Sequence, residues 1–281
     1  MAHIKTPKPV NTTEKITSLE GFLKITGPWQ RRQQFPLGGE GFLGQLWYRG
    51  VNEQFPTQVP GVYRPDFMLR AGQIKANEDH EDKSLRLERE MLSQFRTAGA
   101  AILNPEKLVE TYFIAQHFGL PTRLLDWSTN PLAALFFACD GEPGKDGVVF
   151  AMDARKIIPP KAQKIGTEPL YQSVMTMHHP FVRYAVGVSF WEKVKPDYHP
   201  HILPVRPDII PGRIGQQSSC FTLHMHRAPD ANNDTMITIV VEARSKKGIS
   251  DELRRMNVNL FTIYSDLDHL SLEIKRCWLG T

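Results

Sequence analysis

The chain has 281 residues, of which 41% are hydrophobic and 23% are charged. A chain of this length can bury a full apolar core without disulfide or metal cross-links, which excludes the small cross-linked and the disordered classes of protein. The 34 basic and 30 acidic residues give a formal net charge of +4. This small excess permits an anionic ligand but does not by itself indicate nucleic-acid binding.

Cysteine usage and the lack of long apolar runs predict the compartment. Cys139, Cys220 and Cys277 are odd in number and unclustered, which is typical neither of a disulfide framework nor of a zinc site. The histidines also lack metal-ligand spacing. The sequence has no run of about 18 apolar residues and no signal-peptide pattern. We therefore expect a cytoplasmic protein with no membrane partner and no bound metal.

Apolar periodicity and helix breakers predict the elements of the first hundred residues. Residues 1–15 are polar and contain proline, so we expect a loosely ordered segment ahead of a single domain over 16–281. The predicted elements are a helix from Ser18 that ends at Gly27-Pro28, a strand at 46–48, a proline-rich loop over 51–74 and a helix over 84–97.

Residues 116–138 are the most informative segment, because polar side chains there lie between two strongly apolar helical patterns. Gly119 and Pro121 end the first helix, and Asn130-Pro131 caps and begins the second. We predict that the residues between them lie on a short, firmly held connection. Its chemically versatile residues are His117, Thr122, Arg123, Asp126 and Trp127.

Strand patterns predominate in the second half of the chain. The apolar run 147–152 predicts a strand in the middle of a sheet, whereas 155–212 is rich in proline, lysine and histidine and allows only a short strand near Ile202. Early helices and strands spread along the chain favour an α+β fold with a single mixed or antiparallel sheet and flanking helices. The other predicted elements are strands at 220–224, 236–242 and 260–264 and helices at 250–256 and 266–275.

Arg49 stands at the end of the apolar strand 46–48, where an unpaired cation would cost on the order of several kcal/mol. Its partner is either Asp126 or Glu90 in a structural salt bridge, or a bound phosphate or carboxylate that the guanidinium holds with two hydrogen bonds. Gly50 favours the ligand, because a residue without a side chain lets a ligand approach the backbone.

Each polar residue of the central connection has a structural and a functional interpretation. His117 either bonds to a backbone carbonyl in the core or faces a ligand. Arg123 and Asp126 either pair with each other or contact that ligand. The flat face of Trp127 suits stacking on a nucleobase or nicotinamide, and it equally suits filling the core. Their concentration on one constrained segment favours a site here.

Two residues outside the connection complete the candidate set. Glu90 is the preferred acid, because apolar neighbours on its predicted helix suggest a half-buried carboxylate that is either paired or raised in pKa. Gln217 either binds a ligand amide or satisfies the loop backbone. The chain has no glycine-rich phosphate loop and no nucleophile elbow, so kinase, dinucleotide-fold and serine-hydrolase chemistries are not expected.

Together these residues resemble the FRG domain family, which is named after a Phe/Tyr-Arg-Gly motif. The resemblance covers roughly residues 40–225. Its matching positions are Tyr48-Arg49-Gly50, Glu90-Met91-Leu92 with Phe95, Gln116-His117 through Asp126-Trp127, Asn130-Pro131, and more weakly Arg213-Ile214, Gln217 and Phe221.

The Tyr-Arg-Gly element is also remotely similar to that of ADP-ribosyltransferases, in which the arginine grips a phosphate of NAD. This implies an ADP-ribosyltransferase-like fold, an ADP-ribosyltransferase or NAD glycohydrolase activity, NAD as substrate, and water, a protein or a nucleic acid as acceptor. The implied catalytic residues are Glu90, His117 and Asp126, and the implied NAD-binding residues are Tyr48, Arg49, Gly50, Gln116, Arg123, Trp127 and Gln217.

One position departs from that pattern. Many ADP-ribosyltransferases carry Gln-x-Glu before a late strand, but Ser219 stands two residues after Gln217, so Glu90 or Asp126 would have to supply the carboxylate. The alternative is a non-catalytic module that binds a nucleotide or another anion as a sensor. For either function the family resemblance implies a setting in bacterial or phage defence.

Overall fold

The structure is a computed structural model of the chain. It describes residues 13–31, 46–52, 58–65, 67, 80–104, 106–142, 144–154, 157, 164–165, 168–169, 174–186, 202–207, 218–225 and 236–279. Arg213, Ile214 and Gln217 therefore lie outside the described residues, as do residues 1–12 and most of the stretch 155–212.

An eight-stranded sheet in the order β1-β10-β4-β2-β3-β9-β8-β7 forms the centre of the molecule. The two outermost pairs are parallel and the inner pairs are antiparallel. The predicted α+β class with a single mixed sheet is confirmed. The strands are β1 (Thr13–Ile16), β2 (Leu46–Val51), β3 (Leu124–Ser128), β4 (Gly147–Asp153), β7 (Met175–Thr176), β8 (Ile202–Arg206), β9 (Ser219–His224) and β10 (Met236–Val241), with a separate pair β5 (Lys164–Ile165) and β6 (Glu168–Pro169).

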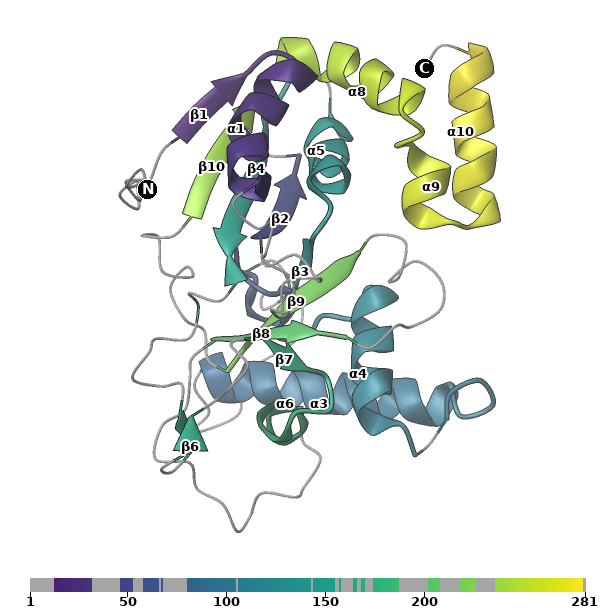
Figure 1. The fold of residues 1–281 in the computed structure, drawn as a ribbon. Coiled ribbons are helices and arrows are strands. Elements are labelled where there is room, and N and C mark those ends of the chain that lie inside the picture. The colour runs from purple at the N-terminus through teal and green to yellow at the C-terminus, as the bar shows by residue number, and fades with distance from the viewer. Residues whose placement is uncertain are drawn as a thin grey trace.

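The helices divide between the two halves of this sheet (Figure 1). Beside the β1-β10-β4-β2 half lie α1 (Leu19–Arg31), α5 (Pro131–Cys139), α8 (Lys246–Arg255), α9 (Leu260–Tyr264) and α10 (Leu267–Leu279). Beside the β3-β9-β8-β7 half lie α3 (His80–Ala98), α4 (Leu108–His117) and α6 (Pro180–Ala185). Short 3-10 turns form η2 (Gly61–Tyr63) and η6 (Ala243–Ser245).

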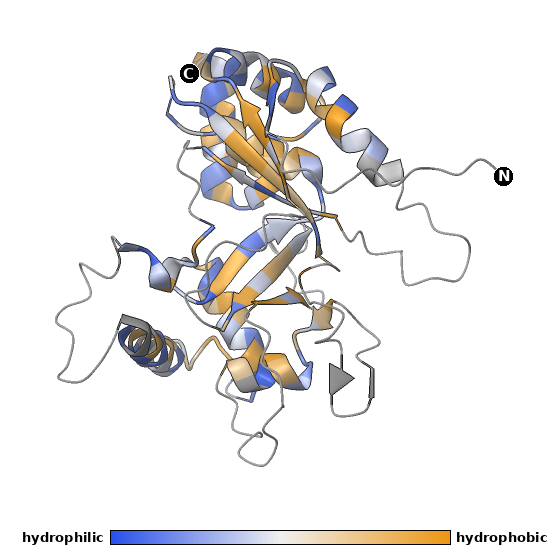
Figure 2. Ribbon diagram, turned by 90° about the vertical axis from the view of Figure 1, so that its left-hand side faces the viewer, coloured by the Kyte–Doolittle hydropathy of each residue, from blue (hydrophilic) through white to orange (hydrophobic). Residues whose placement is uncertain are grey.

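Three apolar clusters follow this division. One packs α1, α5, α8 and α9 on the first half, and a second packs α3, α4 and α6 on the other. The third, which includes Trp47, Trp127 and Phe150, lies on strands of both halves and joins them. Figure 2 shows hydrophobic residues concentrated along the strands of both halves. Burial of this apolar surface is the main force that stabilises the arrangement.

The two halves meet at a weak junction. β2 pairs with β4 along its whole length, and β3 does the same with β9, but β2 and β3 share the single register pair Tyr48 with Ser128. Beyond that pair the two strands leave each other's hydrogen-bonding distance. Side chains can therefore enter the space between the halves of the sheet.

Several predicted elements are confirmed, including the helix around 84–97, the buried strand at 147–152 and the short strand near Ile202. The connection after His117 is more ordered than predicted, because residues 124–128 form strand β3. Leu124 and Leu125 are buried, and the ladder with β9 satisfies their backbone groups. This strand is formed by its long-range pairing with β9, which no local sequence pattern shows.

Three other local predictions are wrong. Residues 260–264 are the helix α9, because Asn259 and Thr262 form a capping box that outweighs the strand propensity of this segment. Helix α1 runs through Gly27-Pro28 to Arg31, since Gly27 keeps a helical backbone instead of the left-handed one of a C-cap. Residues 13–15, which were predicted to be loosely ordered, belong to β1, because this strand pairs with β10 at the sheet edge, where exposed polar residues are tolerated.

Candidate functional site

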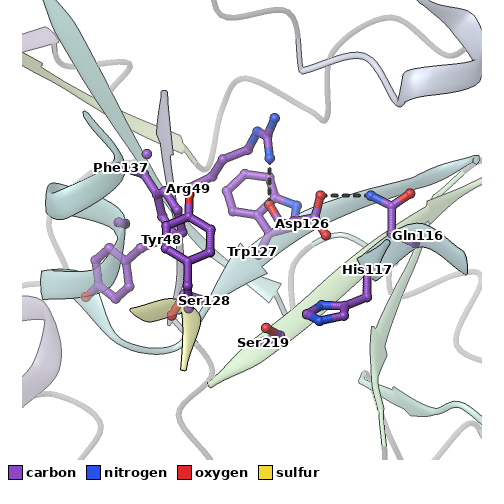
Figure 3. Close-up of a pocket in the computed structure, with 12 residues that line it drawn as sticks. Tyr48, Arg49, Gln116, His117, Asp126, Trp127, Ser128, Phe137 and Ser219 are labelled. Carbon is purple, nitrogen blue, oxygen red and sulfur yellow. Dashed lines mark hydrogen bonds between the residues drawn. The ribbon is translucent and has the colours of Figure 1, made fainter. Parts of the chain in front are cut away.

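A cavity of about 270 Å³ opens at the β2–β3 junction, and we call it the Arg49 cavity (Figure 3). Its walls come from both halves of the sheet, from α4 and α5, and from the end of α9. The lining residues are Tyr48, Arg49, Gly50, Gln116, His117, Asp126, Trp127, Ser128, Ala134, Phe137, Ser219 and Tyr264.

Arg49 crosses the junction from β2 to β3. Its Nη1 donates to the backbone carbonyl oxygen of Asp126 at 2.9 Å, while its buried Nε has no hydrogen-bond partner among the described residues. Burial is the main cause that lowers the pKa of Arg49 to about 10; the Asp126 carboxylate opposes this shift, and the nearby charge of Arg64 contributes to it. The guanidinium stays charged at neutral pH, and part of its hydrogen-bonding capacity is unused within the described chain.

Glycine stands at position 50 for a structural reason that the sequence did not reveal. A Cβ atom at this position would overlap the backbone carbonyl of Ala134 in α5, and one at Gly147 would overlap that of Ala138. The two glycines therefore let α5 lie directly on β2 and β4. The expectation that Gly50 makes room for a ligand is corrected, because a helix backbone fills that space.

Asp126 presents its carboxylate on an otherwise buried strand. The Leu124 amide donates to Thr122 Oγ1 at 3.0 Å, and the Thr122 hydroxyl donates to Gln116 Oε1 at 2.6 Å. This fixes the orientation of the Gln116 amide, so that its Nε2 faces Asp126 and donates to Oδ2 at 2.8 Å (Figure 3). The carboxylate is thereby aimed by a chain of hydrogen bonds that ends on the backbone.

His117 ends α4 and lines the same cavity, half-buried. Its ring makes an edge contact with Phe118, with centroids 5.3 Å apart. Figure 3 shows the imidazole near Ser219, another lining residue that belongs to β9. Of the two sequence interpretations, the placement favours a His117 that faces a ligand.

Trp127 contributes to the cavity wall but packs into the core. Its side chain is only 3% exposed, and its Nε1 donates to Thr222 Oγ1 at 3.0 Å. The Thr222 hydroxyl lies 3.0 Å from His224 Nε2. Burial, together with the charge of Arg49, lowers the pKa of His224 to about 4. The ring is therefore neutral at neutral pH and can accept a hydrogen bond from the hydroxyl. The half-buried aromatic rings that line the cavity are those of Phe137 and Tyr264.

Arg123 lies outside the Arg49 cavity, in a buried network. Its Nε donates to Glu88 Oε2 at 2.6 Å, its backbone amide donates to Glu88 Oε1 at 2.7 Å, and its Nη2 donates to the carbonyl of Ala185. The Tyr112 hydroxyl also donates to Glu88. Burial acts to lower the pKa of Arg123, but the Glu88 charge raises it overall. Arg123 therefore joins α3 and α6 to the start of β3, and its partner is neither Asp126 nor a ligand.

Glu90 is also placed away from the cavity. It is exposed on α3 and forms an ion pair with Arg86, one turn towards the N-terminus, at 3.3 Å. The inward face of α3 instead carries Glu88 and Leu92, which stand four residues apart. Because Leu92 is apolar, its spacing of four residues from Glu88 was the feature of the sequence that could have predicted Glu88 as the buried carboxylate.

The cavity thus unites seven of the predicted residues and excludes Glu90 and Arg123, while Gln217 lies outside the described residues. Sequence reasoning missed the other lining residues. Phe137 lies on the apolar helix α5 and could have been suspected, whereas Tyr264 gave no signal because its segment was predicted as a strand. The lining residues that were missed are Ser128, Ala134, Phe137, Ser219 and Tyr264.

Residues 44–147 match the FRG domain family. This segment is similar to FRG domains and covers 104 of the 281 residues. No curated protein and no solved structure matches the chain. The matched segment supplies every lining residue of the Arg49 cavity except Ser219 and Tyr264, which come from β9 and α9 beyond it. The Tyr-Arg-Gly motif of the sequence lies on β2, at the junction where the cavity opens.

The structure also bears on metal binding and on membrane-spanning helices. Within the described residues, no group of three His, Cys, Asp or Glu side chains is arranged to hold a metal ion. In the same ranges, no helix has the length and apolar character needed to cross a membrane.

Proposed function

We propose that the Arg49 cavity binds NAD and that the protein is an ADP-ribosyltransferase-like enzyme. The observation that supports this is that one cavity holds a half-buried, charged guanidinium and an oriented carboxylate, on strands that share a single register pair. The guanidinium can bind a pyrophosphate, and the carboxylate can stabilise a ribosyl cation.

The proposed reaction breaks the bond between C1′ of the ribose and the nicotinamide nitrogen. The electron pair of that bond leaves with nicotinamide, so that positive charge develops on the ribose. The Asp126 carboxylate stabilises this charge, and Arg49 holds the phosphate next to the ribose. An acceptor hydroxyl or water then forms a bond to C1′ and gives up its proton to solvent or to His117. Asp126 takes the role here that the sequence had favoured for Glu90.

Positioning of the substrate is the second proposed contribution. Phe137 and Tyr264 provide apolar surface for a ring, and His117 lies where it can contact a ribose or nicotinamide. A cavity of about 270 Å³ suits the nicotinamide nucleoside half of NAD rather than the whole molecule, since drug-sized ligands occupy roughly 300–1,000 Å³.

A second candidate function is a non-catalytic module that binds a nucleotide or another anion as a sensor. The observation that favours it is the Gln116 amide, which occupies Asp126 Oδ2 and so reduces the charge that this oxygen can offer. In this account Arg49 supplies the affinity and no bond is broken. Either function suits the defence setting that the family resemblance implies.

The test is to incubate the purified protein with NAD and quantify free nicotinamide, with isothermal titration of NAD in parallel. We expect nicotinamide to accumulate. Radiolabelled NAD offered with candidate proteins or nucleic acids would then distinguish transfer from hydrolysis. Binding of NAD without release of nicotinamide in any of these mixtures would contradict the enzyme and support the sensor.

A further inference from the structure

A second cavity, of about 390 Å³, lies on the other side of Asp126, and we call it the Arg64 cavity. Gln116 and Asp126 line both cavities, so these two residues form a wall that the cavities share. The lining residues of the Arg64 cavity are Gly61, Arg64, Phe67, Gln116, Gly119, Leu120, Pro121, Leu124, Leu125 and Asp126.

Arg64 is held in this cavity from its inner end. It follows the turn η2, and its Nε donates to the backbone carbonyl of Val59 at 3.1 Å. The turn is itself fixed, because the Val62 amide donates to the Thr122 carbonyl at 3.3 Å. Anchoring through Nε directs the terminal Nη groups of the guanidinium away from Val59, which is the arrangement that grips an anion.

The charges around the shared wall are unbalanced. Arg49 and Arg64 are close enough for the charge of Arg64 to disfavour that of Arg49. Among the described residues that line either cavity, Asp126 is the single carboxylate, and one of its oxygens already accepts from Gln116. Two neighbouring guanidinium groups beside one carboxylate leave a net local charge of about +1, which favours an anionic ligand.

We propose that the two cavities form one elongated site for a pyrophosphate-linked ligand, with Arg49 on one phosphate and Arg64 on the other. The part of the ligand beyond the second phosphate lies in the Arg64 cavity, where Phe67, Leu120 and Pro121 provide aromatic and apolar walls for a second ring. Applied to NAD, the adenosine half occupies this cavity. That assignment rests on the proposed function, whereas the pyrophosphate site does not.

Isothermal titration with three probes tests this proposal: NAD, nicotinamide mononucleotide and inorganic pyrophosphate. The variant is Arg64→Gln, and the matched control is Arg255→Gln, which removes the same charge from an exposed position on α8. We expect Arg64→Gln to weaken NAD and pyrophosphate binding about tenfold to a hundredfold, as loss of a charge-assisted contact predicts. Mononucleotide binding should change less than about threefold, because its phosphate belongs to Arg49, and Arg255→Gln should alter none of the three affinities.

The outcomes separate this inference from the proposed function. Nicotinamide release by the wild type, with unchanged NAD and pyrophosphate affinities in Arg64→Gln, would overturn the elongated site and leave the enzyme standing. Arg64-dependent binding of pyrophosphate without nicotinamide release would support the site and remove the enzyme. If neither NAD nor pyrophosphate binds the wild type, the elongated site is overturned. Should Arg64→Gln not fold, Arg64→Lys keeps the charge and must retain pyrophosphate binding within about tenfold.

Discussion

Arg49 on β2 donates a hydrogen bond from Nη1 to the backbone carbonyl oxygen of Asp126 on β3, over 2.9 Å. The two strands otherwise share only the register pair Tyr48 with Ser128. A side chain thus continues the contact between the two halves of the sheet at the point where their backbones separate. The same bond places a cation beside the Asp126 carboxylate, so Arg49 belongs both to the junction and to the proposed ligand site.

We predict that Arg49→Met weakens ligand binding at least tenfold without unfolding the protein. Methionine keeps an apolar stem of similar length. The wild-type guanidinium is half-buried, and its buried Nε has no hydrogen-bond partner among the described residues, so its removal also removes an unfavourable desolvation. The free energy of unfolding should change by less than about 1.5 kcal/mol, while NAD or pyrophosphate affinity falls at least tenfold. Urea denaturation and titration calorimetry measure the two effects. A variant that loses binding because it is unfolded would show that Arg49 acts as a structural cation.

We predict that Glu88→Gln is strongly destabilising. The Glu88 carboxylate accepts from Arg123 and Tyr112, and its side chain is only 2% exposed, so the substitution leaves the Arg123 guanidinium buried without its counter-charge. Loss of one partner from a buried pair costs roughly 3–5 kcal/mol. Glu90→Gln on the same helix is the matched control, because its exposed pair with Arg86 is worth at most about 1 kcal/mol. Equal urea midpoints for the two variants would contradict this account of the Glu88 network.

We predict a pH-dependent stability that depends on His224. Burial, together with the charge of Arg49, lowers the pKa of its ring in the folded protein to about 4, against roughly 6.5 in the unfolded chain. The unfolded state therefore binds a proton first as the pH falls, and stability is lost between about pH 6.5 and pH 4. From pH 7.5 to pH 5, this group should lower the free energy of unfolding of the wild type by about 2 kcal/mol.

His224→Gln is the variant that isolates this effect. Its amide oxygen can still accept from the Thr222 hydroxyl, but the side chain cannot be protonated in this range. Urea denaturation at pH 7.5 and pH 5 should give a smaller loss of stability for the variant than for the wild type, by about 2 kcal/mol. Other titrating groups contribute equally to both proteins and cancel. The same loss in both would mean that His224 is not held neutral by the fold.

Local sequence patterns were enough to find the Arg49 strand and the residues around it. The strand at 46–48, the helix that ends at His117 and the cap at Asn130 are short-range features, and the cavity lies where they meet. The purpose of Gly50 could not be predicted, because it depends on the carbonyl of Ala134 in a helix that is distant along the chain. Pattern alone locates such a glycine but does not say what lies against it.

The choice of Glu90 shows a second limit. Glu88 and Glu90 stand two residues apart on α3, so their side chains point in directions that differ by about 200°. A small error in the assigned face of the helix therefore exchanges the buried acid for the exposed one. Tyr264 shows a third, because the Asn259 capping box outweighed the strand propensity of its segment. Both errors arose where tertiary packing or capping decided between local alternatives.

The central claim is that the carboxylate opposite Arg49 performs chemistry on NAD. The most direct test is the initial rate of nicotinamide release by Asp126→Asn, at saturating NAD, beside the wild type and Glu90→Gln. Asparagine keeps the shape but removes the charge that stabilises the ribosyl cation, so we expect the rate to fall on the order of a hundredfold or more with NAD affinity nearly unchanged. Glu90→Gln should retain the wild-type rate. Full activity in Asp126→Asn, or loss of activity in Glu90→Gln with a normal melting temperature, would contradict the account.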